Sequence, residues 1–87
     1  MNISTASKIT NLSVKTLRYY DDIGLVRPAS RNRSGYRIYD DITIRKLIFI
    51  RRARAFGFSI QECHDLLALY ADEKRSSADV KKIASKR

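Results

Sequence analysis

Two short segments with helical spacing, separated by a turn of three residues, limit most strongly what this chain can fold into. The apolar residues of the first segment lie on one helical face: Ile3, Ala6 and Ile9. Asn2 or Ser4 can cap this helix. Ser13 is placed as the N-cap of a second helix, from Val14 to about Ile23. Two short helices joined so closely predict a helix-turn-helix over about residues 3–23.

The turn and the outward face of the second helix carry the functional interest of this motif. Asn11 tolerates the left-handed backbone that a tight turn requires, and Gly24 is placed to end the second helix. The second helix presents four polar or aromatic side chains outward: Lys15, Thr16, Arg18 and Tyr19. Long donors and an aromatic ring suit base edges in the major groove and phosphates. A plain solvated face is the alternative interpretation.

Residues 25–39 interrupt the helical pattern and predict a small β-hairpin, or wing. Leu25–Val26 is a β-like pair, and Pro28 excludes a helix here. Residues 31–35 form a polar tip, and residues 36–39 alternate as a strand does. The candidates for phosphate contact are Arg31, Arg33, Tyr36 and Arg37. The alternative is an ordinary hairpin with solubilising charges.

Two further helices are predicted to complete the core. Asp40 and Asp41 precede a third helix, from about Ile42 to Phe56, and two acids suit its N-terminal dipole. Its apolar stripe comprises Ile44, Leu47, Ile48, Phe49 and Ile50. Ser59 and Glu62 have the spacing of a capping box for a fourth helix. The apolar face of that helix comprises Ile60, Cys63, Leu66, Leu67 and Tyr70. Cys63 is therefore interpreted as a core residue.

The last segment has a different character. Residues 76–79 resemble a helix start, and an apolar seam with basic surroundings follows: Val80, Ile83 and Ala84. So short a helix buries too little to be stable alone, so it indicates either the start of a coiled-coil-like helix or a frayed basic tail. We therefore divide the chain into a domain over residues 1–70, with its helix pair at 41–70, and a segment over 71–87.

Charge and cysteine content limit the classes of function. The sequence has 18 Lys and Arg against 9 Asp and Glu, a formal net charge of +9, and 44% hydrophobic residues. A foldable domain this basic indicates a polyanionic partner, either nucleic acid or an anionic membrane surface. Membrane binding is disfavoured because one core requires all the apolar faces. No signal peptide or membrane span is visible, and we expect a cytoplasmic protein.

Enzymatic activity is not expected from this sequence. The length of 87 residues is too short for most enzyme folds, and no Ser/His/Asp set or glycine-rich phosphate cradle is present. A single cysteine, Cys63, excludes an internal disulfide, and with one histidine it cannot complete a structural zinc site. We expect no cofactor and no metal site within the chain itself.

Three strings resemble the MerR family of bacterial transcription regulators. Residues 17–26, LRYYDDIGLV, resemble the family's recognition helix and its exit. Residues 34–39, SGYRIY, resemble the wing, and residues 53–62, ARAFGFSIQE, resemble the turn between the third and fourth helices. With their mutual spacing they cover about residues 1–70. The resemblance implies a mainly α fold: a winged helix-turn-helix with a short β-hairpin wing, a helix pair and the start of a dimerisation helix.

The resemblance also implies a mechanism and partners. MerR proteins are dimers that bind promoters whose two recognition elements lie too far apart, and they distort the DNA so that RNA polymerase reads both. The implied partners are double-stranded promoter DNA, a second copy of the chain and, indirectly, RNA polymerase. The implied major-groove contacts are Lys15, Arg18 and Tyr19. The implied phosphate contacts are Tyr36, Arg37 and Arg54, with Arg31 and Arg33 as further wing contacts.

A finer resemblance points to metal response. Residues 1–4, 8–10 and 77–81 resemble the copper-responsive, CueR-like branch, in which a serine opens the dimer helix where divalent-metal sensors carry cysteine. That position is Ser77 here. A missing thiolate favours a low-coordinate monovalent ion, so the resemblance implies Cu(I) for a full-length form, with Ser77 in its effector pocket. Ser77 as a simple N-cap is the alternative.

Two departures from the family pattern bear on these expectations. Position 11 is Asn where the family often has Gly, which the turn should tolerate. The sequence stops at Arg87, before the rest of the dimer helix and the C-terminal cysteine loop of the family. We expect either a fragment or a naturally short relative. The alternative function is a stand-alone, excisionase-like architectural DNA-binding protein without an effector.

Overall fold

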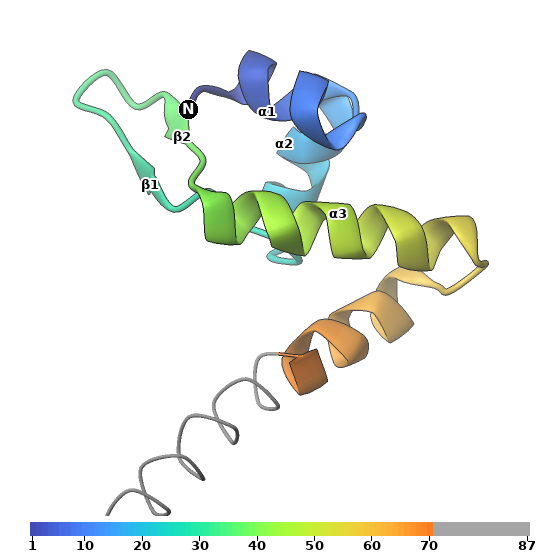
Figure 1. Ribbon diagram of the computed structural model, residues 1–87. Coiled ribbons are helices and arrows are strands. Elements are labelled where there is room, and N and C mark those ends of the chain that lie inside the picture. Colours follow the sequence, from blue (N-terminus) through green and yellow to red (C-terminus); the bar gives the residue numbers. More distant parts are fainter. Residues whose placement is uncertain (71–87) are drawn as a thin grey trace, which may run out of the picture.

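The computed structural model describes residues 1–70 (Figure 1). Its elements, in chain order, are α1 (Ile3–Thr10), α2 (Val14–Asp22), β1 (Ser30–Arg31), β2 (Arg37–Ile38), α3 (Asp41–Ala55) and a helical segment over residues 60–70. The predicted start of a dimerisation helix, including Ser77, lies outside the described residues. The observed order is that of a helix-turn-helix, a two-stranded wing and a helix pair, so the predicted fold class is confirmed.

Each helix begins at a side chain that accepts a hydrogen bond from a backbone amide three residues later. The pairs are Asn2 with Thr5 at 2.9 Å, Ser13 with Thr16 at 3.0 Å, and Asp40 with Thr43 at 2.8 Å. Before residues 60–70, Ser59 and Glu62 form a reciprocal capping box at 2.9 and 3.0 Å. These caps satisfy amides that have no partner within the helix. Of the two candidates for the first cap, the structure selects Asn2.

The turn inside the helix-turn-helix has the predicted left-handed residue. Asn11 has a φ of 59°. This left-handed conformation costs less for asparagine, with its short polar side chain, than for most other residues. Gly57, between α3 and residues 60–70, has a φ of 97°, which favours glycine. Both reversals therefore depend on backbone preferences that are visible in the sequence.

A single core joins the helices. In Figure 1, α3 crosses below α1 and α2, and residues 60–70 lie on its other side. The largest fully buried side chains are Tyr39, Leu17, Leu47, Ile50, Thr10 and Cys63. Cys63 is thus a core residue, as predicted, and burial raises the pKa of its thiol. The core fixes α2 relative to the base of the wing, because Leu17 and Tyr39 belong to it.

Two details of the predicted pattern are wrong. Ile9 is 51% exposed, and the buried position is Thr10, four residues after Ala6. The Thr10 hydroxyl donates a hydrogen bond to the Ala6 carbonyl at 2.8 Å. The step of four residues from Ala6 to Thr10 keeps both on one helical face, whereas the two steps of three from Ile3 to Ile9 turn away from it. Leu25–Val26 is buried but forms no strand, because both amides donate to the Tyr20 carbonyl, at 2.9 and 3.3 Å. These amides close the end of α2 and are not available to a sheet.

The wing itself is minimal. β1 and β2 are antiparallel, with Ser30 opposite Ile38 and Arg31 opposite Arg37. Beyond β2, the Tyr39 amide donates to the Met1 carbonyl at 2.7 Å, which ties the base of the wing to the residues before α1. A two-stranded hairpin of this length is not stable by itself in water, so these contacts with the helical part hold it in place.

Candidate nucleic-acid interface

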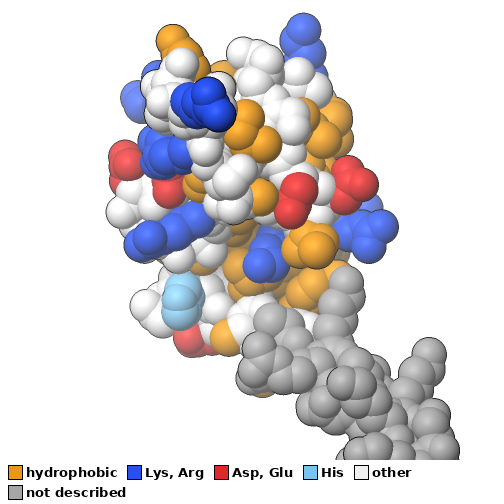
Figure 2. All heavy atoms as spheres, turned by 90° about the vertical axis from the view of Figure 1, so that its left-hand side faces the viewer, with side chains coloured by type: hydrophobic (Ala, Val, Ile, Leu, Met, Phe, Trp, Pro, Cys, Tyr) orange, Lys and Arg blue, Asp and Glu red, His pale blue; other side chains and the backbone are white. Residues whose placement is uncertain are grey.

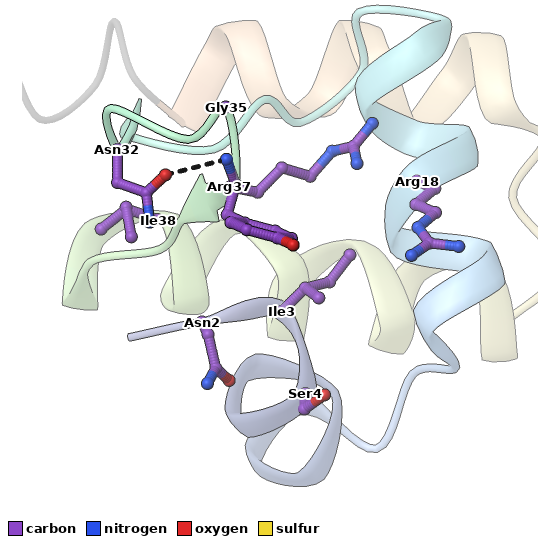
Figure 3. Close-up of a pocket in the computed structure, with 9 residues that line it drawn as sticks. Asn2, Ile3, Ser4, Arg18, Asn32, Gly35, Arg37 and Ile38 are labelled. Atoms are coloured by element: carbon purple, nitrogen blue, oxygen red, sulfur yellow. Dashed lines mark hydrogen bonds between the residues drawn. The ribbon is translucent and has the colours of Figure 1, made fainter.

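An open cleft of about 560 Å³ lies between the start of α1, the outward face of α2 and the wing (Figure 3). Among the predicted site residues it brings together Arg18, Tyr36 and Arg37. Asn2 and Ser4, at the start of α1, also line it, although the sequence analysis did not assign them to the site. The cleft is thus built from three elements that are far apart in the sequence.

The outward face of α2 presents unpaired cations. Lys15 and Arg18 are exposed, and neither forms an ion pair with any residue in the described part of the chain. Thr16 is half-buried, and its hydroxyl accepts a hydrogen bond from the Ser13 hydroxyl at 2.8 Å. Thr16 therefore takes part in capping α2, whereas Lys15 and Arg18 keep their donors for a partner.

Tyr19 faces a different cleft from Arg18. It lines a smaller cleft of about 280 Å³ together with Ile23, Ile60 and His64, next to the helical residues 60–70. Tyr19 is 51% exposed, and its ring centroid lies 6.1 Å from that of the buried Tyr20. Arg18 and Tyr19, two of the predicted α2 contacts, therefore flank the helix, Arg18 on the side of the wing and Tyr19 on the side of residues 60–70.

The structure divides the predicted wing residues into two pairs. Tyr36 is 70% exposed, and Arg33 is exposed and forms no ion pair within residues 1–70. Arg31 and Arg37 both donate to the same Asp21 carboxylate oxygen, at 2.8 and 2.7 Å. The hydrogen bond to Asp21 raises the pKa of Arg37. The tip is thus open to a partner, while the two strands direct their charges toward α2.

The wing tip is shaped by a residue that the sequence analysis missed. The Asn32 side-chain oxygen accepts from the amides of Ser34 and Tyr36, each at 3.0 Å, and Figure 3 shows the second bond. The Asn32 carbonyl also accepts from the Gly35 amide at 2.9 Å. An asparagine side chain that accepts from the amide two residues later forms a common type of turn, and Asn32 before Ser34 has this spacing. The sequence therefore contained a signal for this turn.

Arg54 lies apart from the wing. It is exposed in the last turn of α3, and its Nη1 donates to the Phe58 carbonyl at 2.7 Å. Its charge also acts on the Tyr20 hydroxyl, opposing the burial that raises the pKa of that group. Arg54 is therefore positioned at the turn between α3 and residues 60–70.

The charge on the wing face is not uniform. Figure 2 shows Lys and Arg side chains separated by carboxylates and hydrophobic groups on this face.

In residues 1–70, no group of three His, Cys, Asp or Glu side chains is arranged to hold a metal ion. Within the same residues, no helix is long and apolar enough to cross a membrane. The surface of these residues can donate hydrogen bonds from separate cations, hydroxyls and amides to an extended acceptor.

These features define a winged helix-turn-helix protein. Residues 1–69 match the family model described as MerR HTH family regulatory protein, which covers most of the chain. The chain therefore belongs to the MerR family of helix-turn-helix regulatory proteins, as the sequence strings indicated. It is a member of a family of regulators and not of an enzyme family. The match does not favour the excisionase-like alternative.

The curated relatives are transcription regulators. The chain is 54% identical over 84 residues to the HTH-type transcriptional regulator HmrR of Rhizobium leguminosarum bv. viciae, covering 97% of this chain and 64% of that protein. It is 53% identical to the heavy metal-dependent transcription regulator 1 of Rhizobium meliloti, covering 97% and 58%. It is 45% identical to CueR of Salmonella typhi, covering 94% and 59%. The chain thus spans about three fifths of the length of these relatives.

Two solved structures share the fold. PbrR691 from Ralstonia metallidurans CH34, in complex with lead(II), has a TM-score of 0.72 and 28% identity, covering 99% of this chain and 73% of that one. EcmrR, in a cryo-EM structure of the EcmrR–DNA complex in EcmrR-RPo, has a TM-score of 0.69 and 32% identity, covering 99% and 34%. Both cover the helix-turn-helix, the wing and the helix pair described above.

Proposed function

We propose that this chain binds double-stranded promoter DNA, with α2 in the major groove and the wing along the phosphate backbone. The observation that carries the proposal is the joint placement of the unpaired Arg18 of α2 and the exposed Tyr36 of the wing around one open cleft. Such a pair of elements suits base edges and phosphates together. EcmrR, a solved relative, is bound to DNA, which supports this function.

The proposed contacts follow from donor chemistry and, apart from the half-buried Thr16 and Arg37, from exposure. Lys15 and Arg18 reach base edges and phosphates from α2, with Thr16 and Tyr19 beside them. The proposed phosphate contacts from the wing and the α3 turn are Arg31, Arg33, Tyr36, Arg37 and Arg54. Residues 1–70 form the DNA-binding domain in this account. Residues 71–87 form a linker and the start of a dimerisation helix in this account, so two chains bind one operator.

A metal ion is the proposed effector of the full-length protein. The heavy metal-dependent regulator at 53% identity and the lead(II) complex of PbrR691 support a metal-responsive role. The similarity to CueR, together with serine at position 77, supports Cu(I) in preference to a divalent ion. In this account the protein acts in the bacterial cytoplasm, and its distortion of the promoter affects RNA polymerase indirectly.

The test of the DNA-binding function is a titration of the whole chain with two duplexes. One is an operator selected from a randomised pool by this protein, and the other is a scrambled duplex of equal length. We expect salt-dependent binding that favours the operator, with two chains per duplex by analytical ultracentrifugation. Absence of binding to either duplex at low salt contradicts the nucleic-acid function. Equal binding to both as a monomer contradicts sequence-specific recognition by this chain.

A further inference from the structure

Asp21, near the end of α2, holds both strands of the wing. One carboxylate oxygen of Asp21 accepts from Nη2 of Arg31 on β1 and from Nε of Arg37 on β2. Arg31 and Arg37 are opposite each other in the ladder, so the carboxylate bridges a registered pair. Figure 3 shows the Arg37 side chain extending from the wing toward α2. We refer to Asp21, Arg31 and Arg37 as the wing clamp.

The geometry distinguishes the wing clamp from an ordinary surface ion pair. Exposed pairs stabilise proteins little, because water and salt screen them. The Asp21 side chain is only 10% exposed and that of Arg37 only 20%, so this pair is largely shielded from solvent, whereas the Arg31 side chain is 47% exposed. Charged hydrogen bonds that share one acceptor also restrict orientation more than a single contact does. Beyond the contacts at its base, a hairpin with strands of two residues has few other means of keeping its angle.

We infer that Asp21 is a positioning residue of the DNA interface, and this inference rests on the proposed function. It fixes the angle between the wing and α2, so that Tyr36 and Arg33 meet phosphates when Arg18 lies in the groove. It also directs part of the donor capacity of Arg31 and Arg37 into the protein. Asp21 therefore favours the operator over other DNA, although a carboxylate near a polyanion lowers overall affinity.

The adjacent residue provides a matched control. Asp22 lies on the same helix, its side chain is 72% exposed, and it reaches Arg37 only at 4.0 Å. Asp21→Asn and Asp22→Asn change the net charge equally, so both should bind scrambled duplex more tightly than the wild type. We expect Asp21→Asn alone to lower the ratio of operator to scrambled affinity, by about tenfold, the scale of one charged hydrogen bond. Asp22→Asn should leave this ratio within about twofold.

Three further measurements test the role of Asp21. Asp21→Glu, which keeps the charge, should recover most of the ratio. If Asp21→Asn fails to fold, Arg31→Gln is the substitute variant. It removes the charged donor on β1 and should lower the ratio of operator to scrambled affinity. In the DNA-free whole chain, heteronuclear ¹⁵N NOE values over residues 30–38 should fall in Asp21→Asn and stay unchanged in Asp22→Asn.

The outcomes separate this inference from the proposed function. Equal ratios in the two asparagine variants overturn the positioning role of Asp21. A lower melting temperature for Asp21→Asn with an unchanged ratio overturns it as well, because a purely structural role predicts that result. A wild type without operator preference contradicts the proposed function. In that case the NOE comparison still decides whether Asp21 holds the wing.

Discussion

The basic side chains of α2 and the wing differ in what is left for a partner to bind. Lys15 and Arg18 are exposed and form no ion pair within residues 1–70, whereas Arg31 and Arg37 already share the Asp21 carboxylate. Residue type alone did not separate these groups, because all four are basic residues in segments that face the same cleft. Their partners in the folded chain make the distinction.

At this scale, Arg18 provides the sharpest test of base recognition. We expect Arg18→Ala to weaken binding to the selected operator by about 1–3 kcal/mol, and binding to scrambled DNA by much less, if Arg18 reads a base edge. Tyr36→Phe is the comparison: it removes one neutral phosphate donor and should weaken binding to both duplexes equally. Fluorescence anisotropy titrations of both variants at one salt concentration measure these changes. Unchanged operator affinity in both variants contradicts the proposed docking.

At the scale of elements, helix starts could be predicted from the sequence and wing contacts could not. Ser13, Asp40 and the capping box of Ser59 act on amides within three residues, so local spacing was sufficient. The hydrogen bonds that Arg31 and Arg37 donate to Asp21 join residues 10 and 16 positions apart. Such contacts depend on how α2 and the hairpin pack together, which no local pattern records.

The Asp40 cap makes the stability of α3 dependent on pH. Hydrogen bonds from Thr43 lower the pKa of the Asp40 carboxyl, so the folded state favours the charged form. This stabilisation is complete above the unfolded value of about 3.9 and is lost as the pH falls through the lower folded value.

Asp40→Asn tests this dependence, because asparagine caps well but does not titrate. We expect its unfolding free energy to fall less steeply between about pH 5 and pH 2 than that of the wild type, by urea denaturation followed by circular dichroism. Parallel pH profiles for the two proteins would show that Asp40 contributes no pH-dependent stability.

At the scale of the whole molecule, one core places both proposed DNA-binding elements. Leu17 of α2 and Tyr39 after β2 are buried in the same cluster, so α2 and the base of the wing are fixed together. The net charge of +9 indicated a polyanionic partner as a hypothesis, in line with the proposed DNA binding, but it did not predict the mixed surface in Figure 2. Net charge carries no information on where carboxylates such as Asp21 lie.

The central claim is that α2 and the wing form one DNA-binding surface. The most direct measurement is a ¹⁵N–¹H correlation spectrum of the whole chain, recorded as the selected operator is added. We expect the largest shifts at residues 14–22 and 30–38 together, with smaller shifts near Arg54. Shifts concentrated instead on the groove formed by Arg45, Ile48, Phe49 and Arg52, or shifts at α2 without the wing, would contradict the account.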